Sequence, residues 1–421
     1  MNLLTKITIL IFAVLAFASA SFGQVDKNGG SLYSIYGLGD LNYSASNRTD
    51  AMGILGLALY GDYTNSLNPA SWTRIQSTIF SSKFSLDNIR STDGINNAER
   101  TYGNFEGFNL SIPLNKGNGW IFDLGLNNYS LVNYDARFSS SIEGEEYTQT
   151  YSGNGGLNRL SLGFSYIIFR HFSFGAQFNY AFGNINKSLI IDFTNPALFD
   201  TKNYTSNTIW GLYFNTGLIF HGFGKVFNNK KLDKLTLGVY FSTPAKFDSE
   251  ITGKFNRSVN NIDSLSISEG NLDIPLSFGA GISNEFNDKL ILAADVLLQQ
   301  WDNYKYYGSH PTEIKNNLRA GLGMEYTPSK KLEDSYLKRI SYRLGASYTA
   351  DYLKINNENI NSISLSAGLS LPIGRYNALD LYFKYITRGK SSNGLIKDDV
   401  FRFGASVKIG ELWFLKPSED F

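Results

Sequence analysis

The chain lacks several residues on which enzyme and metal chemistry depends. Its 421 residues include no cysteine, which excludes disulfide bridges, thiolate metal sites and cysteine nucleophiles. Only three histidines are present, His171, His221 and His310, and no Gly-x-Ser-x-Gly motif accompanies them. Metal sites need clustered ligands, and these histidines have no paired acid close by in the sequence. The sequence therefore predicts no enzyme activity, no catalytic residue, no metal and no cofactor.

Charge surplus and long apolar runs are also missing. The chain has 38 basic and 37 acidic residues, a formal net charge of +1. A nucleic-acid-binding protein needs a basic surplus to neutralise phosphates, so no nucleic-acid partner is expected. Beyond the first two dozen residues no apolar run approaches the length of about 18 residues that marks a helical membrane span. Helical spans are therefore not predicted.

Residues 1–24 predict a cleaved secretory signal peptide. A single cation, Lys6, precedes an apolar run from Ile7 to Phe17, and the small residues Ala18-Ser19-Ala20 follow it. The run is shorter than the roughly 20 residues that a membrane-spanning helix needs. A retained anchor helix is the alternative interpretation.

Aromatic residues and glycine are abundant instead, with 31 Phe, 26 Tyr and 40 Gly, and this composition favours β structure. Large apolar residues occupy every second position from Leu160 to Tyr166 and again from Phe172 to Tyr180. A period of two is that of a β-strand with one apolar face. About fourteen such segments lie between Gln76 and Gly410, and most have the length of about 9 to 11 residues that crosses a bilayer as a tilted strand.

The links between these segments favour a membrane barrel over a soluble β domain. Tight turns are predicted at Phe169-Arg170-His171, Asn287-Asp288 and Gly374-Arg375-Tyr376-Asn377. Long polar loops are predicted over residues 87–101, 139–158, 191–207 and 256–272. Short turns on one side and long loops on the other are typical of outer-membrane barrels, with the turns in the periplasm. A soluble sandwich or propeller is the alternative.

The two faces of the predicted strands have different expected surroundings. Aromatic residues near strand ends are expected to form girdles at the membrane interfaces. They are Tyr129, Tyr134, Trp210, Trp301, Tyr304, Tyr306 and Tyr307. Polar residues in the alternation are expected to face the lumen, and they are Arg159, Gln177, Asn179, Asp295, Arg319, Glu325, Arg343, Lys384, Arg402 and Lys408. Side chains just fill a barrel of about eight strands, so a barrel of about fourteen has either a plug or an open channel.

Residues 25–73 are the predicted plug, or hatch, ahead of a barrel over residues 74–410 and a tail over residues 411–421. The hatch shows neither strand alternation nor low complexity. Its stretch from Ala51 to Ala58 is rich in glycine and alanine, which allows backbone to pack closely in a confined space. Asn68-Pro69 predicts a turn at the entry to the first strand.

Two segments resemble the FadL-type family of hydrophobic-compound transporters. Ala51-Met52-Gly53 through Asn68-Pro69-Ala70 is similar to the hatch of that family, which carries a small-residue stretch and an Asn-Pro-Ala signature. Pro275–Phe278 with Asn287–Val296 and Trp301 is similar to its late hairpin. The resemblance covers residues 33–410 and implies an all-β, fourteen-stranded outer-membrane barrel of a Gram-negative bacterium with its hatch in the lumen.

The resemblance also implies uptake of hydrophobic small molecules such as long-chain fatty acids, with sideways release into outer-membrane lipid after the hatch shifts. Asn68, Pro69 and Ala70, together with Gly53 and Gly56, are the candidate hatch and ligand residues. The alternative for Asn68, Pro69 and Ala70 is that they only end a turn and begin the first strand. The alternative function is a non-transporting barrel that is a subunit of an outer-membrane secretion or assembly complex, with protein partners.

Overall fold

The computed structural model describes residues 29–256 and 264–413, so the predicted signal peptide and the end of the predicted tail lie outside the described residues. The strands that build the wall are β2 (Thr78–Thr92), β3 (Asn97–Asn115), β4 (Trp120–Ile142), β5 (Glu145–Ile168), β6 (Phe172–Phe193), β7 (Thr201–His221), β8 (Thr236–Ser242), β9 (Ala245–Asn256), β10 (Ser264–Ile274), β11 (Ser277–Phe286), β12 (Leu290–Gln299), β14 (Asn317–Tyr326), β15 (Ser341–Ile355), β16 (Glu358–Ile373), β17 (Asn377–Gly389) and β18 (Lys397–Glu411). A short β13 (Lys305–Tyr306) pairs with β10.

These elements form a closed antiparallel barrel of 14 strands, as predicted. β8 and β9 both pair with β7 and count as one interrupted strand, because Pro244 lies between them. β10 and β11 are interrupted in the same way at Pro275. Pairing of β18 with β2, from Lys397↔Thr92 to Glu411↔Thr78, closes the ring.

The alternation of the sequence becomes the two faces of the wall. Large apolar side chains such as Phe164, Leu344 and Leu365 point outward and are more than half exposed, as lipid-facing residues are. Eight of the ten predicted lumen residues are buried: Arg159, Gln177, Asn179, Asp295, Arg319, Glu325, Arg343 and Lys384. The other two are partly buried and bind acids inside the barrel, Arg402 at Asp87 and Lys408 at Asp62.

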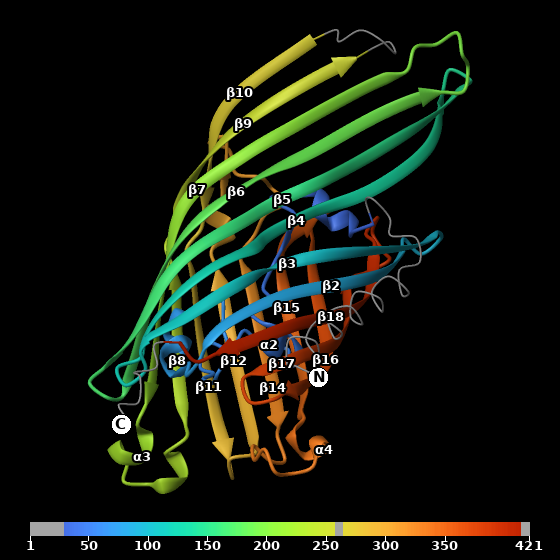
Figure 1. Cartoon of the computed structure of the whole chain (residues 1–421). Coiled ribbons are helices and arrows are strands. Elements are labelled where there is room, and N and C mark those ends of the chain that lie inside the picture. Colours follow the sequence, from blue (N-terminus) through green and yellow to red (C-terminus); the bar gives the residue numbers. More distant parts are fainter. Residues whose placement is uncertain (1–28, 257–263, 414–421) are drawn as a thin grey trace.

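Six strands, β4, β5, β6, β7, β9 and β10, run far beyond the rest on one side of the barrel (Figure 1). The prediction of long loops over residues 87–101, 139–158 and 191–207 is wrong, whereas the predicted loop over residues 256–272 lies partly outside the described residues. Residues 139–158 are almost entirely strand, joined by a turn at Glu143 and Gly144, and residues 194–200 alone connect β6 to β7. Beyond the membrane the outer face of a strand meets water instead of lipid, so the strict apolar alternation ends while the backbone ladder continues.

The opposite end of the barrel has the predicted tight turns. Phe169 and Arg170 have positive φ in one of them, and Asn287 and Asp288 in another. Two longer links also lie at this end, one with α3 (Phe223–Val226) and η3 (Lys230–Leu232), the other with α4 (Tyr336–Arg339). The tight turns therefore lie together at one end, as predicted, but two longer links lie among them, and the other end has extended strands where long loops were predicted.

The predicted aromatic girdle is also largely wrong. Tyr134, Trp301 and Tyr304 are buried inside the barrel, in one apolar cluster with Tyr33 and Leu38. Tyr129 and Tyr306 pack against the same cluster, which also includes the short helix η4 (Trp301–Asn303). The sequence shows that these residues are near strand ends but not that they lie on the lumen side. The extended strands give this end of the barrel an interior that apolar side chains fill.

The segment before β2 fills the lumen as a hatch, as predicted. It contains η1 (Leu32–Ile35), β1 (Asp40–Leu41), α2 (Asn47–Ala51) and η2 (Pro69–Arg74). Every residue of α2 is buried, although this helix packs against the wall rather than against other helices. In the described part of the chain no helix is long and apolar enough to cross a membrane.

Candidate functional site

One ionic network fixes the hatch helix to the wall. Ser46 caps α2 by accepting a hydrogen bond from Thr49 N, which orients the helix at its first turn. Arg48 of α2 then binds Glu325 of β14 through two hydrogen bonds, 2.8 Å from Nε to Oε2 and 2.7 Å from Nη2 to Oε1. Arg343 of β15 shares Oε2 of Glu325 at 2.7 Å. The carboxylate is therefore paired on two sides, which compensates its burial.

A second anchor holds the inner strap, residues 53–59, which follows α2. Asp295 Oδ2 on β12 accepts hydrogen bonds from the backbone N–H groups of Leu55, Gly56 and Leu57, at 2.9, 2.7 and 3.4 Å. Gly56 has a φ of +74° there, and a Cβ on it would meet Thr49. Gly53 has a φ of +67° and lies against the backbone of Ala346 on β15. Glycine suits both positions because the left-handed region strains other residues.

The Asn-Pro-Ala turn ties this strap to the first strand. Asn68 Nδ2 donates to Leu57 O at 2.6 Å, and its Oδ1 accepts from Ala70 N at 3.0 Å. The side chain therefore caps η2, with Pro69 at the first helical position, where its missing N–H is not needed. Trp72 Nε1 donates to Asn65 O at 2.8 Å and locks the other side of the turn.

Glycines in the wall make room for this hatch backbone. A Cβ at Gly217 would overlap Asn68, one at Gly175 would overlap Pro69, and one at Gly238 would overlap Leu57. The hatch therefore rests directly on the wall backbone.

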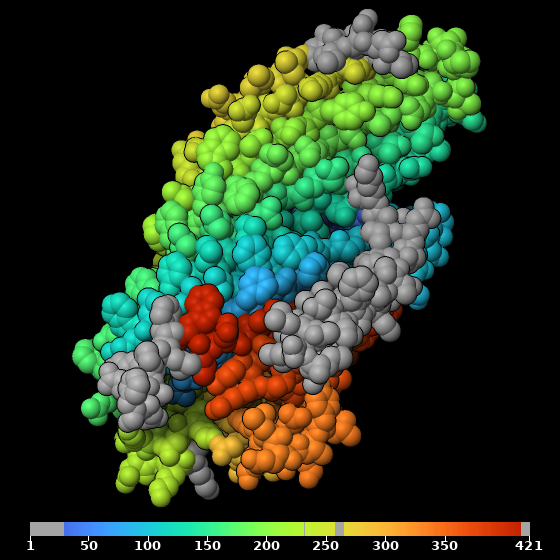
Figure 2. All heavy atoms as spheres, viewed as in Figure 1, coloured from blue at the N-terminus to red at the C-terminus, as the bar shows by residue number. Residues whose placement is uncertain are grey.

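The wall itself is interrupted beside the hatch. β3 and β4 pair only from Asn115↔Trp120 to Gly107↔Asn127, although both strands continue outward. The remaining part of β3 pairs with β2 and that of β4 with β5. The two strands separate in Figure 1, and the surface is hollowed between them in Figure 2. The barrel therefore has a lateral gap at this position.

The start of the hatch covers the β4 edge of the gap. β1 pairs with β4 at Asp40↔Leu131 and Leu41↔Ser130, and Asn42 N donates to Tyr129 O at 3.0 Å. Next to this pairing Ser34 Oγ hydrogen-bonds with the backbone of Asn133. This edge strap, residues 34–42, takes the place of β3 as the backbone partner of β4 at residues 129–131. Across the gap, Asn128 of β4 still donates to Phe105 O of β3 at 3.0 Å.

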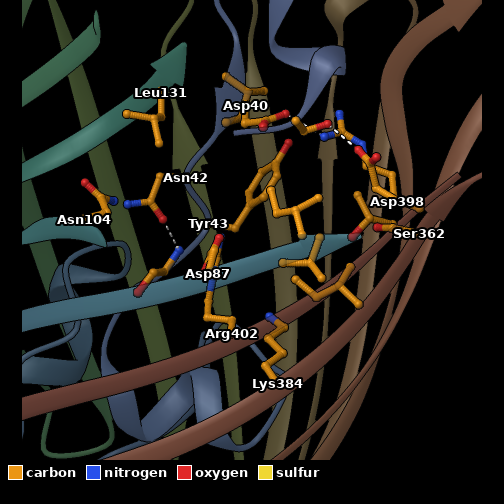
Figure 3. Close-up of a pocket in the computed structure, with 18 of the residues that line it drawn as sticks. Asp40, Asn42, Tyr43, Asp87, Asn104, Leu131, Ser362, Lys384, Asp398 and Arg402 are labelled. Carbon is orange, nitrogen blue, oxygen red and sulfur yellow. Dashed lines mark hydrogen bonds and ion pairs between the residues drawn. The ribbon is translucent and has the colours of Figure 1, made fainter. Parts of the chain in front are cut away.

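A polar cavity of about 170 Å³ lies behind the edge strap (Figure 3). Asp40 projects into it from the strap and binds Arg388 at 2.6 Å. Arg388 also holds Asp351 at 2.5 Å, and Arg402 holds Asp87 on the far wall at 2.6 Å. Burial raises the pKa of Asp40, and the neighbouring Arg388 guanidinium opposes that rise. The edge strap is therefore fixed by ionic contacts as well as by backbone pairing.

Farther from the hatch helix the lumen is apolar. Leu38 of the edge strap contacts the cluster that contains Tyr33 and Trp301, and a cavity of about 300 Å³ lies beside it. Leu38, Ile209 and Tyr304 line this cavity, and Lys187 at its border donates to Ile35 O at 2.8 Å. Such a space suits an apolar solute better than an ion.

The structure brings all the candidate hatch residues together. Asn68, Pro69 and Ala70 lie in one turn against the wall, and Gly53 and Gly56 lie in the strap that Asn68 binds. Whether they touch a ligand stays a prediction.

The sequence did not reveal the wall partners of the hatch. Asp295 and Glu325 were placed in the lumen by the alternation, but nothing local relates them to residues about 240 and 277 positions earlier. The edge strap was missed completely, because a two-residue strand has no periodicity.

Comparison with known proteins places the fold. The sequence profile of a protein family described as BamG matches residues 4–418. The chain is 16% identical to the CymD monoaromatic hydrocarbon channel, with a TM-score of 0.58 over 90% of this chain and 99% of that one. The Ralstonia pickettii toluene transporter TbuX is 15% identical, with a TM-score of 0.56 over 86% and 97%.

A FadL homologue from Pseudomonas aeruginosa is similar too, at 14% identity and a TM-score of 0.51 over 81% and 92% of the two chains. No curated protein matches the sequence. The predicted resemblance to FadL-type barrels and the outer-membrane location are confirmed.

Proposed function

The chain belongs to the BamG family, and we propose that it is an outer-membrane channel that takes up hydrophobic small molecules such as long-chain fatty acids. The solute enters the apolar cluster from outside, moves along the hatch, and leaves sideways into lipid. Channels and transporters of monoaromatic compounds share this fold, which supports the solute class.

The observation that carries the proposal is the gap between β3 and β4. A closed β wall leaves no sideways route, because its backbone groups pair with neighbours all round. Here residues 129–131 of β4 pair on that side with the edge strap instead of β3. The strap belongs to the hatch, so a shift of the hatch would uncover the gap. This joins the plug and the exit in one movable segment.

A reversible lock tests the route. Leu41→Cys with Ser130→Cys places two cysteines at directly paired positions in a chain that otherwise has none. After oxidation we expect uptake of a labelled long-chain fatty acid into cells to be lost, and a reductant to restore it.

The matched control joins Ser139→Cys to Thr148→Cys, a pair in the β4–β5 ladder that has no reason to open. Its uptake should be unaffected by oxidation. Full uptake by the oxidised variant with Leu41→Cys and Ser130→Cys would rule out the edge strap as the gate. Absence of uptake by the unmodified protein would overturn the transport function.

The alternative is a non-transporting subunit of an outer-membrane assembly or secretion complex. The match to the BamG family points to this alternative. The hydrocarbon channels support transport less strongly than a close relative would, because they share only the fold at low identity. The two functions differ in what accompanies the native protein. Purification in mild detergent, followed by organic extraction with mass spectrometry and by native mass measurement, separates them. A retained hydrophobic compound supports transport, whereas a stoichiometric protein partner without any such compound supports the subunit.

A further inference from the structure

Two links at the short-turn end of the barrel share an unusual composition. The α3 link comprises residues 222–235 and the α4 link residues 327–340, and both project beyond the strands in Figure 1. The α3 link has four basic residues against one acidic, and the α4 link four against two, in a chain whose net charge is only +1. Each link also exposes large apolar side chains: Val226 and Phe227 in the first, Leu332 and Leu337 in the second, all more than half exposed.

The α3 link continues the lipid-facing surface. Phe172 and Phe220 lie on neighbouring strands with ring centroids 4.8 Å apart. Phe220 meets Phe223 of α3 edge to face at 4.6 Å, and Phe223 stacks on Phe227 at 6.2 Å. One row of aromatic rings therefore runs from the wall into the link.

The α4 link is attached to the same surface. Tyr342, an outward-facing residue at the start of β15, donates from its hydroxyl to Leu337 O at 3.1 Å. The two links are also connected to each other, because Glu285 of β11 pairs with Lys234 at 3.7 Å and with Lys330 at 2.8 Å. They thus form one basic and apolar surface beside the lipid-facing wall.

Several cations of this surface form no close ion pair or hydrogen bond with the described part of the chain. Lys225, Lys230, Lys331 and Lys338 are exposed. Across residues 29–256 and 264–413, none of their ammonium groups forms a salt bridge or hydrogen bond. Short-turn ends of outer-membrane barrels face the periplasm, so these groups lie near the phospholipid leaflet on that side.

We propose that the α3 and α4 links bind the anionic headgroups of phospholipids in the periplasmic leaflet. Phe227, Val226 and Leu337 insert at the acyl boundary, and the lysines extend to the phosphates. Basic residues combined with large apolar ones are the composition of segments that lie in a membrane interface. The occupant is lipid rather than a protein partner because the apolar residues adjoin the lipid-facing rings. The protein would thereby be fixed in depth and rotation in its membrane.

A lipid titration of the purified full-length protein tests the proposal. Native mass spectrometry measures retention of phosphatidylglycerol and of phosphatidylcholine with identical acyl chains. We expect phosphatidylglycerol to be retained preferentially. Substituting Lys225, Lys230, Lys331 and Lys338 with Gln should weaken that retention by about fivefold for each lysine that reaches the anionic surface, which is several hundredfold if all four do.

The matched control is Lys246→Gln with Lys254→Gln on β9, exposed lysines at the extended end of the barrel. This variant should retain phosphatidylglycerol like the unmodified protein. Equal retention of the two lipids by the unmodified protein, or an unchanged preference in the four-lysine variant, would overturn the proposal.

A second measurement does not depend on the folding of the four-lysine variant. Phe227→Cys, labelled with a fluorophore in a chain without other cysteines, is reconstituted into phosphatidylglycerol vesicles with brominated acyl chains. We expect the label to be quenched. An unquenched label, or one protected only when a periplasmic protein is added, would refute insertion into lipid.

Discussion

Asp295 holds the hatch through three backbone amides, so hatch stability should be sensitive to the charge of this residue. Asp295→Asn keeps the shape and one acceptor oxygen but removes the charge. Hydrogen bonds to charged groups are worth about 1.5–3 kcal/mol and neutral ones about 1 kcal/mol. We therefore expect the free energy needed to open the inner strap to fall by about 1.5 kcal/mol. Hydrogen exchange at residues 55–57 should accelerate about tenfold as a result.

Asp123→Asn is the control at this scale. Asp123 is equally buried in the lumen wall, but it accepts from Ser111 Oγ at 2.6 Å rather than from the strap. Exchange at residues 55–57 should be unchanged in this variant. Equal acceleration in both variants would mean that the strap responds to the general polarity of the lumen and not to its anchor.

Among the elements, transmembrane strands were predictable from sequence and extramembrane strands were not. β6 from Phe172 to Tyr180 alternates strictly because lipid faces one side and the lumen the other. From Ile185 onward the same strand has no apolar period, although its ladder with β7 continues to Ile191↔Thr201. Backbone pairing holds such a strand without help from a buried face, and backbone pairing leaves no mark in the sequence.

The hatch elements show the same limit. Asn68-Pro69-Ala70 is visible because a capping side chain and proline act locally. The edge strap depends on β4, about 90 residues away, and its Asp40↔Leu131 pair could not be inferred. Local chemistry therefore predicts turns and caps, whereas the contacts that determine the candidate gate are long-range.

For the whole molecule, the decisive property is that a barrel of 14 strands is closed by a hatch that a few polar anchors hold to the wall. The two lumen cavities beside the edge strap measure about 170 and 300 Å³, so the unmodified protein should conduct almost no current in a planar lipid bilayer. Arg48→Met removes the anchor of α2, and Asp295→Ala removes the anchor of the inner strap. We expect this double variant to give frequent current steps, because the hatch can then leave the lumen transiently.

The two single variants define what the current reports. Arg48 and Asp295 lie on separate attachments, to β14 and β12, so each single variant leaves one anchor and should conduct little. A current in the double variant well above the sum of the singles would show that the anchors act together to close the lumen. Additive currents would mean that each anchor closes a path of its own. A silent double variant would assign closure to the edge strap and its Arg388–Asp40 pair instead.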